Sequence, residues 1–201
     1  MSESAESAES SEAPGRRRLT ICGLTELGAF RNADVTHILS ILDPSYPDPA
    51  DFASYRPHKR LTLRFDDIIE AGPGMQLPER RHIEALLAFG DGLAVPEGDP
   101  LGHLLVHCHA GISRSTASMT ILLAEALPEA GADALYARIR EIRPQAWPNS
   151  RMIGLADDLL GRGGMLVDGL RRHYGEQIRR RPDLADMIQR VGRGKEVLMA
   201  A

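Results

Sequence analysis

Cysteine is scarce in this chain of 201 residues, which contains only Cys22 and Cys108. Two thiols so far apart exclude a disulfide framework and a zinc site made of cysteines alone, and they leave single-thiol chemistry open. Aromatic residues are also few, with four Phe, four Tyr and one Trp. Nucleic-acid binding needs stacking residues and a basic surface, so we expect no nucleic-acid partner.

Long apolar runs are absent as well. Charges, Gly or Pro interrupt every hydrophobic stretch, and the first residues are acidic and rich in serine. This pattern predicts neither a membrane-spanning helix nor a secretory signal, so we expect a soluble cytoplasmic protein with no membrane partner. A chain of 201 residues with 43% apolar residues is long enough for one well-buried core, and we expect a monomer.

The net charge of −4 is concentrated at the N-terminus. Residues 1–13 contain four of the 28 acidic residues and no base, which leaves 24 acidic and 24 basic residues in the rest of the chain. The same segment has no large apolar residue apart from Met1, so it cannot bury enough surface to offset the entropy of ordering. We therefore expect residues 1–15 to be a disordered acidic tail, followed by a body that is neutral overall.

Short apolar runs and helical spacings alternate through the body. The patterns predict strands at residues 19–24, 35–42, 61–65 and 104–106, and helices at 79–90, 114–127, 133–142 and 150–160. Residues 43–57 and 91–102 are rich in turn-forming residues and are expected to be loops. Alternating strands and helices predict one α/β domain over residues 16–161, with a central, mostly parallel sheet flanked by helices.

Residues 162–201 form a C-terminal extension of different character. It carries nine basic and five acidic residues, and its spacing indicates two amphipathic helices near 165–178 and 184–191. The arginines at positions 171, 172, 179, 180 and 181 are interpreted as a solvated helix face, with docking of an acidic partner as the alternative. No role for this extension follows from the sequence.

The most informative stretch is VHCHAGISRS, residues 106–115. It places Cys108 after a buried strand and Arg114 at the start of a helix, where backbone N–H groups and the positive end of the helix dipole favour an anion. Gly111 permits a close backbone approach, and the Arg114 guanidinium can hold two phosphate oxygens. The same positive field favours the thiolate form of Cys108. We therefore expect a phosphate site without metal or cofactor, lined by His109, Ala110, Gly111, Ile112, Ser113 and Arg114.

A thiolate that attacks phosphorus needs an acid to protonate the leaving oxygen. Asp66 and Asp67 follow the third predicted strand and precede a loop rich in Gly and Pro, which suits a carboxyl group carried over the site. Because successive residues leaving a strand point to opposite sides, we expect only one of them to reach the pocket. Local pattern alone does not decide which one.

The Cys-x5-Arg-Ser loop, preceded by His and accompanied by an upstream aspartate, resembles the dual-specificity branch of the cysteine-dependent protein tyrosine phosphatases, most closely a small bacterial subgroup. The resemblance covers residues 16–161 and implies a phosphocysteine on Cys108, with Arg114 binding the phosphoryl oxygens. It further implies that Ser115 assists departure of the thiolate and that His107 tunes the cysteine. Asp67 matches the position of the family's general acid.

The resemblance also extends to a segment further along the chain. Residues 145–150, QAWPNS, stand where this family places a loop flanking the pocket, so Asn149 is a supporting candidate. The implied activity is hydrolysis of phosphotyrosine in proteins, with phosphoserine and phosphothreonine also open as substrates. At His109, Ile112 and Ser113, the expected phosphate site lacks the lysines that family members acting on inositol phosphates often carry. This difference argues against a highly charged lipid headgroup as substrate. Tyr46 and Tyr55 in the 43–57 loop could stack on a phosphotyrosine ring, with ordinary loop surface as the alternative.

Three other interpretations are compatible with parts of this pattern. A silent module would bind phosphate or a phosphopeptide without releasing phosphate, and a sulfurtransferase-type enzyme would use Cys108 without the aspartate. A metal site would draw on His103, His107, Cys108 and His109, but His107 and His109 on one strand point away from Cys108. We expect Cys22 to be a buried core thiol and Trp147 to serve packing.

Overall fold

The computed structural model describes residues 17–93 and 102–200. The predicted disordered tail at 1–15 and most of the predicted loop at 91–102 lie outside these residues. Four strands form one fully parallel sheet in the order β1-β4-β2-β3, made of β1 (Arg18–Cys22), β2 (Val35–Leu42), β3 (Lys59–Arg64) and β4 (His103–His107). The predicted α/β class and parallel sheet are therefore confirmed, and β4 occupies an inner position between β1 and β2.

Helices follow the predicted order, with α1 (Arg80–Asp91), α2 (Arg114–Ala126), α3 (Ala132–Ile142), α4 (Ser150–Leu159), α5 (Met165–Arg180), α6 (Pro182–Arg190) and α7 (Gly194–Leu198). Helix α7 was not predicted, because it is too short to display a helical period. Within the described ranges, no helix combines the length and the apolar character needed to cross a membrane.

Two 3-10 helices correct the predictions for the N-terminal part. The predicted strand at 19–24 ends at Cys22, because η1 (Leu24–Phe30) begins directly after Gly23. The predicted surface loop at 43–57 contains η2 (Ala50–Ser54), whose Phe52 is 8% exposed. Both corrections have one cause, since these short segments bury apolar residues against the sheet and gain from tertiary contact what local propensity does not supply.

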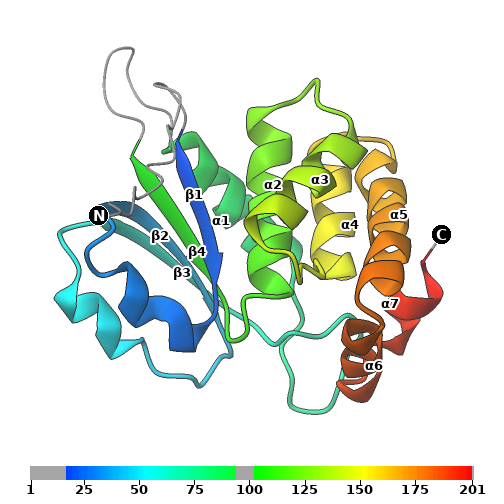
Figure 1. The fold of residues 1–201 in the computed structure, drawn as a ribbon, viewed down its shortest axis with the longest axis horizontal. Helices are drawn as coiled ribbons and strands as arrows, with labels where there is room; N and C mark the ends of the chain where they lie inside the picture. Colours follow the sequence, from blue (N-terminus) through cyan, green and yellow to red (C-terminus); the bar gives the residue numbers. More distant parts are fainter. Residues whose placement is uncertain (1–16, 94–101, 201) are drawn as a thin grey trace, which may run out of the picture.

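The sheet lies between two layers of unequal thickness. Figure 1 shows the stack of helices on one face and the two 3-10 helices on the other. Ile21, Leu39 and Val106 belong to the larger core beneath the helices, whereas their chain neighbours face the smaller core of Cys22, Leu27, Val35, Ile38, Phe52 and Leu105. Burial on both faces explains why these strands read as continuous apolar runs rather than alternating ones.

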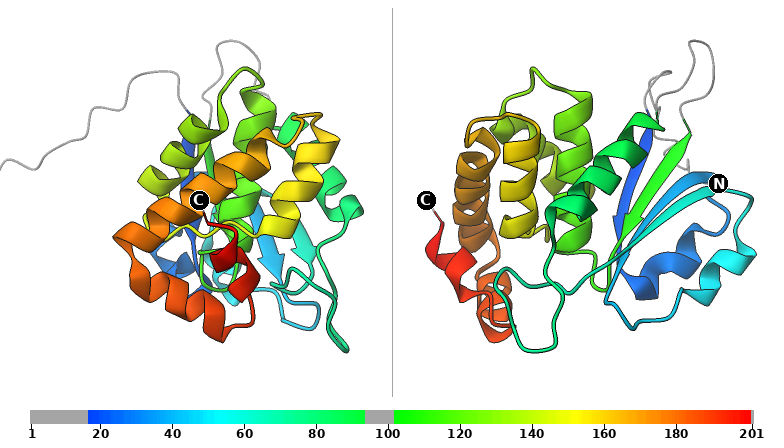
Figure 2. Two further views of the ribbon diagram at one scale, coloured as in Figure 1. Left: turned by 90° about the vertical axis from the view of Figure 1, so that its right-hand side faces the viewer. Right: turned by 180° about the vertical axis from the view of Figure 1, so that it is seen from behind.

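The C-terminal helices share the larger core. Leu166, Leu170 and Tyr174 of α5 are fully buried, and α5 packs against α3 and α4 on the side remote from the sheet (Figure 2). The five arginines at 171, 172, 179, 180 and 181 lie outside this packing in ion pairs with nearby acids. Such exposed pairs contribute little to stability, in agreement with a solvated helix face.

Candidate active site

The loop at the end of β4 brings Cys108 to the N-terminus of α2. Cys108 follows the last residue of the strand, is 2% exposed, and has its Sγ atom 3.2 Å from Ser115 Oγ. Arg114 is the first residue of α2, so the loop between the cysteine and the arginine opens onto a helix N-terminus. The loop therefore lies at the carboxyl end of an inner strand, and ligand sites in parallel sheets form at such strand ends.

Gly111 shapes the path of this loop. Its φ is +69°, and a Cβ at this position would come within 2.5 Å of the Cys22 carbonyl carbon at the end of β1. A side chain here would combine a left-handed backbone with a collision against the backbone of β1, so glycine is required for both reasons.

The carbonyl groups of the loop are bonded on its outer side. His109 O accepts from Leu24 N at 2.9 Å, and Ile112 O accepts from Trp147 N at 2.8 Å. Arg143, which was not among the predicted site residues, donates to Gly111 O at 3.0 Å. Since N–H and C=O of a peptide point in opposite directions, these bonds leave the amides of the loop to face its concave side, where an anion would bind.

Arg143 is itself held in place by an acid on η1. Its guanidinium contacts Glu26 through two hydrogen bonds of 2.8 Å and also reaches Ala110 O at 3.1 Å. These bonds from Arg143 lower the pKa of Glu26. The pair therefore fastens the outside of the loop to the η1 side of the sheet.

Arg114 contacts an acid, Asp43, that was not among the predicted site residues. The arginine is 3% exposed, and its Nη1 donates to Asp43 Oδ1 and to Phe65 O, each at 2.6 Å. Asp43 directly follows β2, the strand beside β4, so its carboxylate reaches the same edge of the sheet. Only the tertiary fold reveals this partner, because Asp43 reads locally as the start of a turn.

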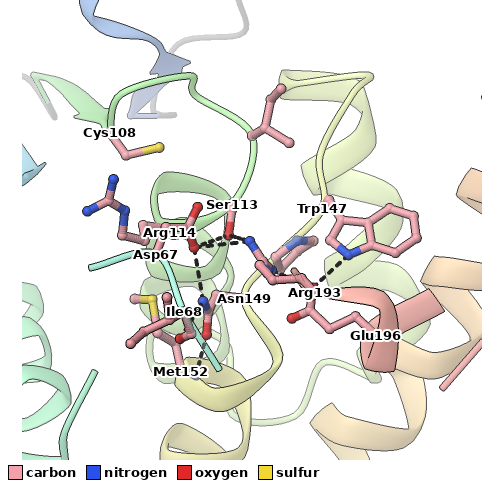
Figure 3. Close-up of polar contacts among 12 residues, drawn as sticks. Asp67, Ile68, Cys108, Ser113, Arg114, Trp147, Asn149, Met152, Arg193 and Glu196 are labelled. Carbon is pink, nitrogen blue, oxygen red and sulfur yellow. Dashed lines mark hydrogen bonds and ion pairs between the residues drawn. The ribbon is translucent and has the colours of Figure 1, made fainter. Parts of the chain in front are cut away.

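The two candidate acids have different surroundings. Asp66 Oδ2 accepts from Gln76 N at 2.6 Å, and Asp66 N donates to Gln76 O at 2.8 Å, so this residue closes the base of the following loop. Asp67 points instead to the loop at residues 108–114, a candidate anion-binding loop, where its Oδ1 accepts from Ser113 Oγ at 2.7 Å. The opposite directions expected for successive residues are thus realised, with Asp67 on the side of Cys108 (Figure 3).

Asn149 joins the same carboxylate. As the N-cap of α4, it accepts from Met152 N through Oδ1 at 3.2 Å. Its Nδ2 donates to Asp67 Oδ1 at 3.0 Å and to Ile68 O at 3.3 Å. A single amide therefore caps a helix and fixes the segment that carries Asp67.

A third donor to Asp67 comes from the C-terminal extension. Arg193, in the connection between α6 and α7, donates from Nη1 to Asp67 Oδ1 at 3.0 Å and to Ser113 Oγ. Its Nη2 donates to Glu196, which is fully buried and also accepts from Trp147 Nε1 at 2.9 Å. No sequence pattern pointed to Arg193, because the pairing joins residues 126 positions apart.

Opposing effects act on the carboxyl group of Asp67. Burial by itself would raise its pKa, but the guanidinium groups of Arg193 and Arg114, together with hydrogen bonds from Ser113 and Asn149, lower the pKa below its ordinary value. The charge on Asp67 is therefore stabilised in the ligand-free structure.

The histidines beside Cys108 are neutral at physiological pH. Burial lowers the pKa of His107 to about 4, and its Nε2 lies 2.7 Å from Ser40 Oγ. Burial and the charge of Arg114 lower the pKa of His109, whose ring makes an edge contact with the half-exposed Tyr46 at 4.6 Å between centroids. Tyr46 is thus beside the loop, whereas Tyr55 donates its hydroxyl to Leu27 O at 2.6 Å and serves the fold.

Cys22 is fully buried in the smaller core, where burial raises the pKa of its thiol to about 12. Trp147 is also fully buried and stacks on Tyr174 with centroids 4.4 Å apart. Within residues 17–93 and 102–200, no three His, Cys, Asp or Glu side chains gather into a group that could hold a metal ion.

Comparison with solved structures identifies the fold. Human DUSP28 superposes with a TM-score of 0.52 at 21% identity, over 72% of this chain and 94% of its own. DUSP15 gives 0.51 at 21% identity over 79% and 91%, and the Cydia pomonella PTP-2 phosphatase gives 0.53 at 16% over 71% and 86%. No protein-family model and no curated protein sequence matches the chain. The chain has the fold of the dual-specificity and protein tyrosine phosphatases.

Proposed function

We propose that this protein is a cysteine-dependent phosphomonoester hydrolase of the protein tyrosine phosphatase type, acting without a metal or cofactor. One arrangement carries the proposal. Cys108 opens a loop whose amides face one side, Arg114 closes that loop, and Asp67 is bonded to Ser113 within it. A nucleophile, an anion cradle and an acid in one place are the components that phosphoryl transfer to a thiolate requires.

The first half-reaction transfers the phosphoryl group to the protein. The substrate phosphate sits on the loop amides and the Arg114 guanidinium, and the Cys108 thiolate attacks phosphorus. The bond between phosphorus and the leaving oxygen breaks, and that oxygen takes a proton from Asp67. A cysteinyl phosphate and a free alcohol or phenol result. Oriented donors around the equatorial oxygens stabilise the charge of the transition state.

The second half-reaction restores the thiolate. Water attacks phosphorus while the Asp67 carboxylate accepts its proton, and the bond between phosphorus and sulfur breaks. Ser115 Oγ, 3.2 Å from Cys108 Sγ, donates a hydrogen bond to the departing thiolate. Inorganic phosphate leaves, and the proton that Asp67 takes from the attacking water replaces the one that it gave to the leaving group.

We further propose an aryl phosphate as substrate, with phosphotyrosine in a protein as the physiological form. Tyr46 supports this choice, because its half-exposed ring lies against the cradle residue His109 and offers an apolar surface to an aromatic leaving group. The test is the ratio of kcat/KM for a phosphotyrosine peptide to that for a phosphothreonine peptide of the same sequence. Tyr46→Ala should lower this ratio, whereas an unchanged ratio removes the argument for an aryl pocket.

The central experiment measures phosphate release from an aryl phosphate with a metal chelator present. Cys108→Ser should abolish turnover, and Cys22→Ala is the matched control because it removes the other, buried thiol. Trapping of radiolabelled phosphate on wild-type protein after acid quench, and its absence in Cys108→Ser, identifies the intermediate. Peroxide should inactivate the wild type reversibly, since an attackable thiolate oxidises to a sulfenic acid that thiols restore.

Each alternative function predicts a distinct result, either in this assay or in a parallel assay of vanadate binding or sulfur transfer. Binding of vanadate without any phosphate release by the wild type would indicate a silent binding module. Loss of sulfane-sulfur transfer in Cys108→Ser, together with full activity in Asp67→Asn, would indicate a sulfurtransferase. Loss of phosphate release on chelation would contradict the metal-free mechanism.

A further inference from the structure

The C-terminal extension places the buried guanidinium group of Arg193 beside the candidate acid, Asp67. Arg193 is 2% exposed although it lies between two short helices near the end of the chain, where most charged side chains are solvated. Burying a guanidinium group is costly, and packing alone would be served as well by an apolar residue of similar size. The partners of Arg193 therefore indicate why it is buried. Its Nη1 donates to Asp67 and Ser113, as Figure 3 shows.

Arg193 has a rigid support on its other side. Glu196 binds its Nη2, and the same carboxylate accepts from Trp147 Nε1 at 2.9 Å and from Ser150 N at 2.8 Å. Ser150 is the first residue of α4, directly after Asn149. The glutamate thus ties Arg193 to the helix whose cap also reaches Asp67, so both donors share one support.

The three donors to Asp67 all meet at one oxygen. Ser113, Asn149 and Arg193 donate to Oδ1, and the other carboxylate oxygen is turned away from them toward the side of Cys108 (Figure 3). A carboxyl group held in this way carries its transferable proton on Oδ2, because an oxygen that already accepts three hydrogen bonds is the poorer site for a proton. The bonds therefore orient the acid.

We propose that Arg193 is a positioning residue for Asp67, supplied by the C-terminal extension, which holds Oδ1 against the anion-binding loop so that Oδ2 faces the leaving group. The inference rests on the proposed phosphatase function, and it assigns the extension a part in that reaction. Arg193 acts through Asp67 and touches no reacting atom.

The charged groups around Asp67 also make its protonation depend on Arg193. Arg193 faces it from the connection between α6 and α7, Arg114 from α2, and His109 from the loop. Both arginines lower the pKa of Asp67, while the neutral His109 adds no charge at physiological pH. A bound phosphate dianion opposes both arginines, so Asp67 becomes easier to protonate when substrate is present. Removal of Arg193 should raise the pKa of Asp67 further.

The kinetic test compares Arg193→Met, Arg193→Lys and the control Lys195→Gln on phenyl phosphate and on 4-nitrophenyl phosphate. Lys195 pairs with Glu70 on the segment after Asp67 and is exposed, so it joins the same two parts of the chain without touching the carboxylate. A poor leaving group depends on the acid more than a good one. Arg193→Met should lower kcat about tenfold or more on phenyl phosphate, much less on 4-nitrophenyl phosphate, with KM little changed.

The pH profile separates positioning from a general structural defect. The basic limb of kcat should move to higher pH in Arg193→Met and stay near the wild-type position in Arg193→Lys and Lys195→Gln. In an Asp67→Asn background, Arg193→Met should cause no further loss, because its effect passes through the missing acid. Equal losses on both substrates, or an additive loss in Asp67→Asn, would overturn the proposal.

A direct titration makes the result independent of activity. The carboxyl carbon of Asp67, assigned by difference from Asp67→Asn, is followed by NMR in the wild type and in Arg193→Met/Glu196→Gln, which removes both buried charges so that neither is left unpaired. The Asp67 pKa should be higher in the double variant. An unchanged pKa overturns the inference, whereas a raised pKa without Cys108-dependent hydrolysis in the wild type would refute the proposed function alone.

Discussion

Replacement of Asp67 by Asn is the sharpest test of the catalytic assignment, and Asp66→Asn is its matched control. The asparagine oxygen can still accept from Ser113, Asn149 and Arg193, so the segment keeps its anchors while losing the transferable proton. General acid catalysis contributes about 100- to 10,000-fold, equivalent to about 3 to 5 kcal/mol of transition-state stabilisation. Asp67→Asn should lose activity in this range.

The control changes the neighbouring residue in the same manner. Asparagine at position 66 keeps an acceptor for Gln76 N, so the loop remains closed and activity should stay close to that of the wild type. Asp66→Ala, in contrast, removes the 2.6 Å hydrogen bond and should destabilise the fold by about 1 kcal/mol.

The assay is kcat on phenyl phosphate between pH 5 and 8, with thermal unfolding measured in parallel. Activity of the wild type should fall as pH rises through the pKa of Asp67 in the substrate complex, because the acid must be protonated to act. Asp67→Asn should lack this basic limb. A greater loss in Asp66→Asn than in Asp67→Asn, or a basic limb that persists in Asp67→Asn, would refute the assignment.

Three further predictions concern the surroundings of the site. Asp43→Asn keeps an acceptor for Arg114 but removes a competing negative charge, so inhibition by inorganic phosphate should become several-fold stronger; weaker inhibition would mean that the charge of Asp43 is needed to place the arginine. Tyr174→Phe loses a hydrogen bond to a backbone carbonyl and should reduce the urea unfolding free energy by about 1 kcal/mol without changing KM. Burial lowers the pKa of His107 and His173 to about 4 from 6.5, so stability should be constant above about pH 6.5 and fall toward pH 4, by up to about 3 kcal/mol for each histidine; a flat urea midpoint over that interval would contradict their burial.

Asp43 and Asp67 balance the positive charge of the arginines in the ligand-free site. Asp43 neutralises Arg114, and Asp67 lies between Arg114 and Arg193, so the positive charges that would attract phosphate are already balanced by carboxylates. Such balance avoids leaving buried guanidinium groups unpaired when no substrate is bound. Under the proposed function, phosphate must compete with Asp43 for Arg114, which should favour dianionic ligands over singly charged ones.

Local sequence patterns were sufficient to predict the parallel α/β class, the order of its main elements, and the loop in which a cysteine, a glycine and an arginine stand at a strand-to-helix junction. These features are local: a strand, a turn and a helix start are written in neighbouring residues, and the spacing from Cys108 to Arg114 is set within seven positions. The same locality explains why the helices at 114–126 and 150–159 were predicted to within a residue or two.

The side chains that surround this loop could not be predicted, because long-range packing brings them there. Asp43, Arg143 and Arg193 lie 71, 32 and 80 positions from the loop residues that they contact, and each resembles an ordinary surface charge in its local sequence. Their roles arise when parallel strands bring separate chain segments to one edge of the sheet and the C-terminal helices close over the far side. Arg143 and Arg193 are largely buried there, so solvent screens their charges less, and they become specific partners of the loop and of the candidate acid.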